Sequence, residues 1–145
     1  MDFFDSLDIS ASGLVAQRVR MNVIASNLAN VETTRTAQGG PYRRQDVVFR
    51  AVPLSPSFGE AFRHALDGRP SEVEVVDIVT DRRPPKRLYA PSHPDADASG
   101  YVAVPNINVI EEMVNMLSAT RSYEANVTAI QSAKSMALRA LEIAR

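Results

Sequence analysis

Cysteine and tryptophan are absent from the 145 residues of the chain. Without cysteine there is no disulfide, no thiolate zinc site and no cysteine nucleophile. An excess of charge of one sign is missing too, because 16 basic and 17 acidic residues leave a formal net charge of -1. This balance argues against nucleic acid as a partner, since phosphate binding needs a basic surface.

Long apolar runs are also missing. No stretch approaches the roughly 18 apolar residues of a membrane-spanning helix. The first ten residues, MDFFDSLDIS, lack both the basic region and the apolar core of a signal peptide. We therefore expect neither a membrane anchor nor a Sec-type signal peptide. Hydrophobic residues nevertheless make up 45% of the chain, enough for a packed core or interface in one domain.

Proline is missing from both ends of the chain. All nine prolines lie between residues 41 and 105, and five of the six glycines lie between 39 and 100. Because proline breaks helix interiors, only the two ends are free to form long helices. We predict a mainly α fold, with N- and C-terminal coiled-coil-forming helices that flank a small Pro/Gly-rich, β-containing insert. The predicted division is an N-terminal helix over 1–31, an irregular β-rich insert over 32–105, and a long C-terminal helix over 106–145.

The N-terminal helix is predicted from about residue 10 to residue 30. Leu14, Met21 and Leu28 repeat every seven residues, and Ile24 and Val31 follow the last two after three residues. Such spacing is the a/d pattern of a coiled coil. We expect Asn30 to end this helix, because asparagine tolerates the left-handed conformation found at helix ends.

The C-terminal helix is predicted to begin after Asn108, an N-cap residue with Glu111 in the capping-box position. Apolar positions then recur in steps of three and four for about five heptads, which predicts a helix roughly 50 Å long. From both helices, the residues predicted to form a subunit interface are Leu14, Met21, Ile24, Leu28, Val31, Met113, Met116, Leu117, Tyr123, Val127, Ile130, Leu138 and Leu141.

Two interpretations of these helices stay open. They can pack on each other as a helical hairpin. The second helix is expected to be nearly twice as long as the first, however, so one partner would leave apolar side chains exposed, and monomers rarely expose such a stripe. We therefore expect neighbouring copies to cover it. Five asparagines on the helices either fix the register of packing or face solvent: Asn22, Asn27, Asn30, Asn115 and Asn126.

Alternating and β-branched residues predict three strands in the insert, over 46–49, 72–79 and 101–104. A short helix is predicted over 58–66. Two prolines and several Asp and Ser residues predict an ordered turn region over 90–99.

Chemically reactive groups are few. Residues 95–100 resemble the start of a calcium loop, but the twelfth position is Asn106 where a bidentate glutamate is needed, so we favour a turn held by Asp side chains. His64 and His93 are too differently placed to form a pair. The basic run over 82–87 either recruits an acidic partner or is a solvated loop, and we favour the loop. We expect no catalytic residue, no metal site and no cofactor; a small enzyme using His93 is the rival interpretation.

Short motifs along the chain resemble one protein family. Residues 20–30, RMNVIASNLAN, resemble the N-terminal signature of flagellar axial proteins, which comprise rod, hook and related components. Further segments resemble the proximal-rod branch of this family: GGPYRR at 39–44, YAPSHPDAD at 89–97, PNIN at 105–108, EMVNM at 112–116, RSYEANV at 121–127 and KSM at 134–136. The resemblance covers almost the whole chain and thins only around 53–75.

This resemblance implies a structural subunit of the proximal rod in the bacterial flagellar basal body. It implies export by the flagellar type III apparatus without a cleaved signal peptide, and a place in the rod that crosses the periplasm, near the membrane ring at its base. The partners it implies are other rod proteins and further copies of the chain, packed through the terminal helices in a torque-transmitting shaft for motility. It implies no small-molecule substrate. A sister rod protein is the alternative, against which the segment 89–97 argues.

Overall fold

The fold is seen in a computed structural model that describes residues 3–53 and 71–143. Two long helices at the ends of the chain flank a small insert of two antiparallel two-stranded sheets, as predicted. The short helix predicted over 58–66, with His64, lies outside the described residues. In chain order the elements are α1 (Phe3–Ala29), β1 (Gln45–Pro53), β2 (Ser71–Thr80), β3 (Lys86–Tyr89), β4 (Tyr101–Val104) and α3 (Val109–Ile143).

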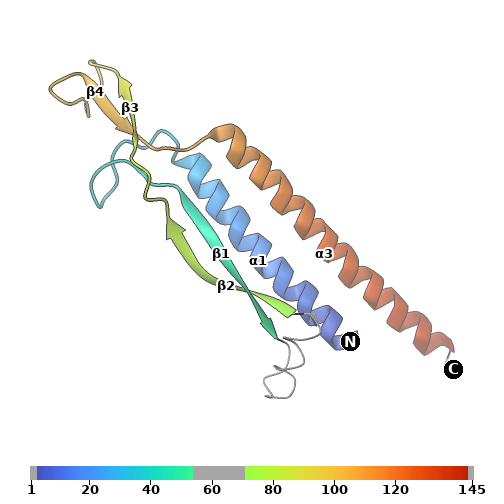
Figure 1. The fold of residues 1–145 in the computed structure, drawn as a ribbon. Helices are drawn as coiled ribbons and strands as arrows, with labels where there is room; N and C mark the ends of the chain where they lie inside the picture. Colours follow the sequence, from blue (N-terminus) through green and yellow to red (C-terminus); the bar gives the residue numbers. More distant parts are fainter. Residues whose placement is uncertain (1–2, 54–70, 144–145) are drawn as a thin grey trace.

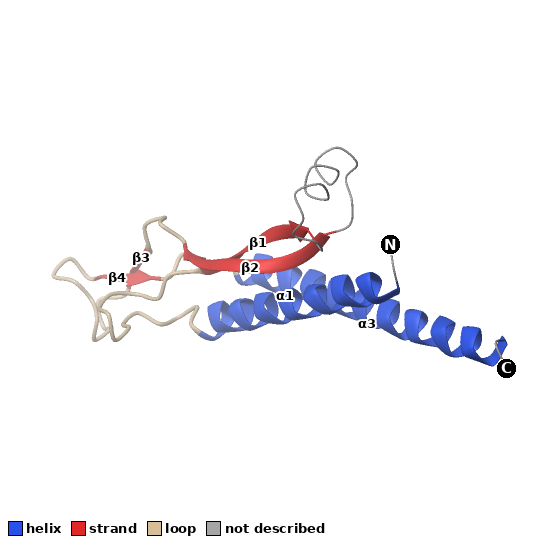
Figure 2. Cartoon of the chain, turned by 90° about the horizontal axis from the view of Figure 1, so that it is seen from below, coloured by secondary structure: helices blue, strands red, loops and turns tan. Residues whose placement is uncertain are grey.

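The molecule is elongated, and α1 is its central element (Figure 1). One side of α1 contacts α3, which runs antiparallel to it, and another side contacts the β1–β2 hairpin (Figure 2). The β3–β4 hairpin projects from the end of the molecule where α1 stops and α3 starts (Figure 1). The helical-hairpin arrangement of the two terminal helices is therefore present within one subunit.

Helix α1 begins at Phe3, several residues before the predicted start, and has 27 residues. Leu7 continues the seven-residue repeat of Leu14 backwards, and this signal was overlooked. Since α3 has 35 residues, the expectation that it is nearly twice as long as α1 is wrong. Asn30 directly follows the last residue of α1, as expected of the residue that ends the helix. It does not adopt the left-handed conformation, however, because no described residue other than glycine has a positive φ. Asn30 instead caps the helix by donating its side-chain amide to the Ser26 carbonyl, at 2.9 Å.

Helix α3 starts as predicted, with Asn108 as its N-cap. The Asn108 side-chain oxygen accepts a hydrogen bond from the Ile110 amide at 3.1 Å, and its carbonyl accepts one from the Glu112 amide. This satisfies amides that would otherwise lack a partner at the helix start. Glu111 and Glu112 also place negative charge at the positive end of the helix dipole.

Small side chains make up much of the buried core. Ala16, Ala119 and Ala133 are buried, alongside Val23 and Ile24. A side chain on Gly13 would have its Cβ only 2.8 Å from the Asn126 amide nitrogen. The helices therefore approach closely and enclose a thin core, which leaves most of α3 facing outward.

The two sheets of the insert have simple registers. Strands β1 and β2 pair from Gln45↔Thr80 to Pro53↔Ser71, with a bulge between Val48 and Phe49. Strands β3 and β4 pair along their whole length, from Lys86↔Val104 to Tyr89↔Tyr101.

Strand β3 had not been predicted, because its four residues follow two prolines and show no alternation. The predicted turn region before β4 is confirmed. Asp97 accepts hydrogen bonds from the amides of Ser99 and Tyr101 at 2.8 and 3.0 Å, and Gly100 there has a φ of 79° that suits glycine.

The surface of the chain is large for its mass. It amounts to 10252 Å² for 15.9 kDa, whereas a compact monomer of that mass exposes roughly 7,300 Å². The excess is comparable to the area that the two partners of a permanent interface bury together, about 2,000–5,000 Å².

Candidate functional site

Two polar side chains are buried where α1, α3 and the start of β1 meet. Asn27 is 0% exposed and Glu112 is 1% exposed, although asparagine and glutamate are mostly found exposed in proteins. With Tyr42, Arg44 and Gln45 they form what we call the Asn27 cluster. It joins residues from both terminal helices to the first strand of the insert.

Every hydrogen-bonding group of the Asn27 side chain has a partner. Its amide nitrogen donates to the Gln45 carbonyl at 2.8 Å and to Glu112 Oε2 at 2.9 Å. Its oxygen accepts from the Gln45 amide at 2.9 Å and from the Tyr42 hydroxyl at 3.1 Å. Since Tyr42 gives its one proton to Asn27, the 3.3 Å contact between Ser26 Oγ and the Tyr42 hydroxyl has Ser26 as donor.

The negative charge of Glu112 is balanced by Arg44. Arg44 Nε donates to Glu112 Oε1 at 2.8 Å, and the same guanidinium donates to Asp46 Oδ2 at 2.9 Å. Partial burial of Arg44 disfavours its charged form, but the bonds to Asp46 and Glu112 outweigh this and raise the pKa of Arg44. A charge-balanced, fully bonded buried cluster holds elements together in one arrangement.

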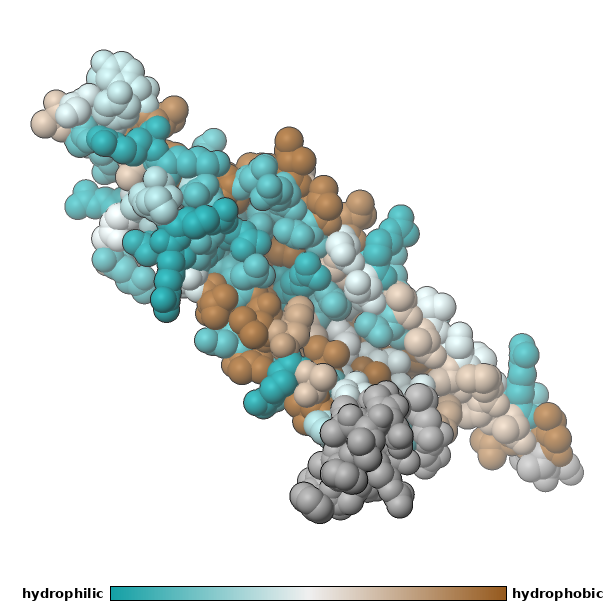
Figure 3. All heavy atoms as spheres, in the orientation of Figure 1, coloured by the Kyte–Doolittle hydropathy of each residue, from teal (hydrophilic) through white to brown (hydrophobic). Residues whose placement is uncertain are grey.

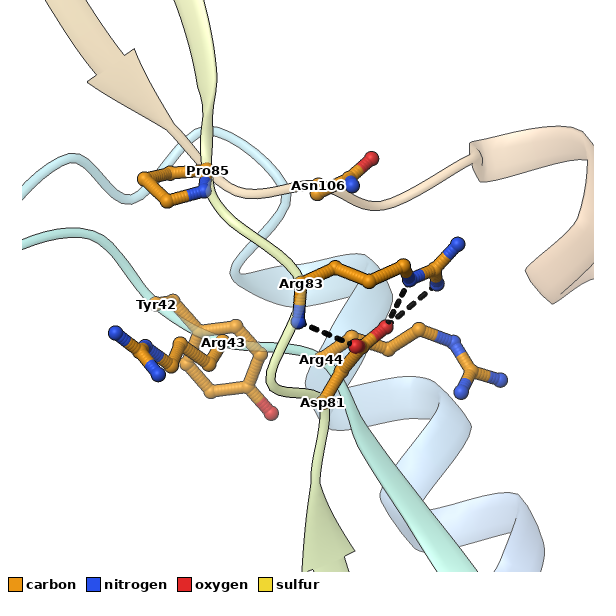
Figure 4. Close-up of a pocket in the computed structure, with 7 residues that line it drawn as sticks. All are labelled: Tyr42, Arg43, Arg44, Asp81, Arg83, Pro85 and Asn106. Carbon is orange, nitrogen blue, oxygen red and sulfur yellow. Dashed lines mark hydrogen bonds and ion pairs between the residues drawn. The ribbon is translucent and has the colours of Figure 1, made fainter.

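A hollow beside the cluster has no room for a ligand. Tyr42, Arg44, Asp81, Arg83 and others line it, and Asp81 and Arg83 are hydrogen-bonded directly to each other (Figure 4). Its volume of about 10 Å³ corresponds to roughly one water molecule. The bonds from the Arg83 side chain and amide lower the pKa of Asp81, which therefore stays ionised and paired.

The candidate chemical groups from the sequence have structural partners. His93 Nδ1 accepts the Asp95 amide at 3.1 Å, and Asp95 accepts the Thr34 hydroxyl at 2.7 Å. Within residues 3–53 and 71–143, no three His, Asp or Glu side chains are grouped so as to hold a metal ion. In the basic run, Arg87 pairs with Asp97 at 2.7 Å and stacks on the Tyr101 ring.

No helix in the described part of the chain combines the length and apolar character needed to cross a membrane.

Apolar side chains are exposed along the outer side of α3 (Figure 3). Ile110, Met113, Val114 and Leu117, which we call the α3 stripe, are 73%, 59%, 62% and 59% exposed. Their spacing of three and four residues puts them on one face of the helix. At 100° per residue this face lies opposite the buried Glu112, and so away from α1.

The C-terminal part of α3 runs past the start of α1 (Figure 2). Leu138, Leu141 and Ile143, which we call the α3 overhang, are all exposed there. A second set of exposed apolar residues lies on the β1–β2 hairpin and includes Val76, Ile78 and Val79 (Figure 3).

The residues predicted as subunit interface fall into two groups in the structure. One group is buried or half-buried within the subunit: Leu14, Met21, Ile24, Leu28, Val31, Met116, Tyr123, Val127 and Ile130. The other group is exposed: Met113, Leu117, Leu138 and Leu141. The second group belongs to the α3 stripe and the α3 overhang.

The sequence reasoning missed the Asn27 cluster as a unit. Asn27 was considered only as one of five helix asparagines that either fix register or face solvent. Asn27 is fully buried, whereas Asn22 is exposed. The sequence indicates Glu112 only as a partner of the helix dipole, and nothing in its type or spacing identifies Asn27, 85 positions away, as its neighbour.

Comparison with known proteins finds the same protein type at both ends and over the whole length. A family model described as flagella basal body rod protein matches residues 7–35, which include Asn27. One described as flagellar basal body rod FlgEFG protein C-terminal matches residues 98–143, which include Glu112 and the α3 stripe.

Several curated relatives carry the name flagellar basal-body rod protein FlgC. The protein from Borreliella burgdorferi is 47% identical over 149 residues, covering 99% of this chain and 98% of its own. The protein from Bacillus subtilis is 45% identical, with 100% of both chains covered. The protein from Escherichia coli O6:H1 is 41% identical, covering 99% of this chain and 98% of its own.

Proposed function

The chain belongs to the FlgC family of flagellar basal-body rod proteins, and we propose that it polymerises in the rod through its two terminal helices. It is a structural subunit of the flagellar basal body and serves motility. A sister rod protein is not favoured, because relatives with the FlgC name match the whole chain.

The observation that carries the proposal is the α3 stripe. It remains exposed after α1 has covered the opposite face of α3. Burying one large apolar side chain stabilises a complex by about 1.5–3 kcal/mol before association costs are subtracted. The stripe residues Ile110, Met113, Val114 and Leu117 thus supply a driving force for association.

Helices of neighbouring subunits are the proposed partners of this surface. A long helix with a continuous apolar face packs well against another long helix, by fitting the ridges of one into the grooves of the other. The α3 overhang continues the exposed apolar surface beyond the N-terminal start of α1. It would therefore lie beside a subunit further along the rod. The predicted division into two polymerising helices and an outer insert, 1–31, 106–145 and 32–105, remains part of this proposal.

The family also supports a wider setting for the chain. We place it in the part of the rod that crosses the periplasm, beside other rod proteins and copies of itself, near the membrane ring. Export through the flagellar type III apparatus and torque transmission by the packed helices belong to the same proposal. Closely packed helices resist deformation, which suits a rotating shaft.

Val114→Glu and Leu117→Glu test the proposal directly, with Ala129→Glu as control for an added charge at an exposed position of α3 that lies to the side of the stripe. Each isolated variant should keep the helical circular dichroism of the parent, because exposed substitutions change stability by only about 0.5 kcal/mol. The two stripe variants should fail to enter basal bodies and to restore swimming in cells lacking the native protein. The control should do both. Normal incorporation of both stripe variants would refute the proposed surface.

A further inference from the structure

We propose that Asn27 is a positioning residue, which sets the direction in which the β1–β2 hairpin leaves the helix pair and thereby the shape in which the subunit enters an assembly. The part of this inference that concerns assembly rests on the proposed function. The part that concerns the hairpin rests on the geometry of the Asn27 cluster alone.

The Asn27 side chain acts on β1 as a neighbouring strand would. It accepts a hydrogen bond from the Gln45 amide and donates one to the Gln45 carbonyl, at 2.9 and 2.8 Å. Gln45 is the first residue of β1, so this pair of hydrogen bonds holds the start of the hairpin, which we call its root. The second amide hydrogen of Asn27 bonds Glu112 on α3, so one side chain ties the hairpin root to both helices.

No other side chain of similar size can replace this set of bonds. Aspartate has no hydrogen to donate, so the Gln45 carbonyl and Glu112 would both lose a partner. It would also place a second carboxylate beside the buried Glu112. Leucine would remove all four of the Asn27 hydrogen bonds. Glutamine carries the same amide but is one methylene longer. Because the site is fully buried, the longer side chain would overpack it.

The hairpin is also bonded to α1 at a point far from the cluster. The Val73 amide donates a hydrogen bond to Ser12 Oγ, at 3.1 Å. Val73 lies far along the hairpin from Gln45, since it pairs with Ala51. Two well-separated attachments to α1 fix the direction of the hairpin. Loss of the Asn27 bonds would leave its root held to the helices by the neighbouring Arg44–Glu112 pair, and so less restrained from turning about the point at Ser12.

The test compares Asn27→Asp with Asn22→Asp, which makes the same change at an exposed position of the same helix. The full chain is studied by far-ultraviolet circular dichroism and residue-resolved amide hydrogen exchange, and then for incorporation into basal bodies. A third variant combines Asn27→Asp with Glu112→Gln. This variant moves the buried carboxylate of the cluster from α3 to α1. The new amide on α3 can donate to the new carboxylate on α1, while its oxygen still accepts from Arg44.

Asn27→Asp should keep its helical signal while amides of β1 exchange at least about tenfold faster than in the parent, with those of the α1–α3 contact little changed. Incorporation should fall, and the combined variant should recover part of both losses. Asn22→Asp should match the parent. Parent-like exchange in β1 of Asn27→Asp would overturn the inference. Faster exchange in β1 with normal incorporation would overturn its role in assembly.

Tyr42→Phe provides a milder test if Asn27→Asp does not fold. It removes only the hydroxyl that donates to Asn27. Faster exchange confined to the Gln45 amide and its neighbours in β1 supports positioning, whereas an equal increase in the helices and β1 means a general stabilising role and overturns it. The α3-stripe variants fail or succeed independently of these readouts, because they leave the Asn27 cluster intact.

Discussion

Gly13 and Asn126 mark one of the closest approaches between the two long helices. A Cβ on Gly13 would lie 2.8 Å from Asn126 Nδ2, and Asn126 itself donates to the Ser122 carbonyl at 3.0 Å. Glycine inside a helix destabilises it by about 0.5–1 kcal/mol relative to alanine. The glycine is therefore tolerated because it makes room for a polar side chain of the other helix.

Gly13→Ala should show little gain in the parent protein, because the new methyl group displaces Asn126. In the Asn126→Ala background the same change should raise the free energy of unfolding by about 0.5–1 kcal/mol, through helix propensity alone. Urea unfolding of the four proteins measures this coupling. Equal gains in both backgrounds would show that the close approach has no energetic consequence.

Asp97 predicts a pH effect on the loop between β3 and β4. Hydrogen bonds from the Tyr101 and Ser99 amides and from Arg87 lower its pKa below the ordinary value of 3.8. The folded pKa is depressed, so its contribution is present above pH 3.8 and is lost as the pH falls through the lower, folded value. Amides 99 and 101 should therefore exchange faster only in strong acid. In Asp97→Ala they should be fast at every pH, and parent-like protection in this variant would contradict the account.

Residue types predicted some local roles well and others poorly. Asn108 as an N-cap and Asp97 as a turn residue were predictable, because both act on backbone groups within a few positions. Asn27 and Glu112 depend on a partner far away in the chain. Their burial follows from how α1, α3 and β1 meet, which no local pattern encodes.

Of the two helices, α3 has the less complete surroundings in the subunit. The overhang residues Leu138, Leu141 and Ile143 are 53%, 67% and 86% exposed. Apolar side chains that are exposed in the subunit contribute little to its stability. Their contribution is expected only when a neighbour covers them.

Truncation after Ala137 should therefore leave the melting temperature of the subunit nearly unchanged, with a change in unfolding free energy below about 1 kcal/mol. The same truncation should strongly reduce incorporation into basal bodies. Thermal unfolding and immunoblotting of purified basal bodies measure the two effects. A large fall in melting temperature would mean that the overhang packs within its own subunit.

The helices were predictable as elements because their apolar repeats are long, while their partners were not. The same seven-residue repeat suits packing against a helix of the same chain or of another chain. Ile24, predicted as interface, is 4% exposed and packs inside the subunit, whereas Leu117 is exposed. Strand β3 escaped prediction since four residues carry too little pattern, and its pairing with β4 is what makes it a strand.

For the whole molecule, the surface of 10252 Å² is the property that most favours assembly. A thin core of alanines and one pair of long helices cannot cover the apolar side chains of both faces of α3. A shape of this kind reaches high stability when neighbours complete it. The elongated form in Figure 1 also presents its helices along most of its length.

Association should accordingly be reversible and concentration-dependent in the isolated protein. Sedimentation velocity over a hundredfold range of concentration should show larger species at the upper end for the parent, but fewer for Val114→Glu. Loss of apolar burial and a buried charge both oppose association in the variant. Identical sedimentation of parent and variant would exclude the α3 stripe from self-association.

The absence of cysteine permits the most direct test, because Val114→Cys introduces the only thiol in the chain. Val114 is 62% exposed in the subunit, so a maleimide should label the new thiol rapidly in the isolated protein. In basal bodies purified from swimming cells the same thiol should be protected, and it should react once they are dissociated. Rapid labelling in intact basal bodies would contradict the claim that neighbouring subunits cover the outer face of α3.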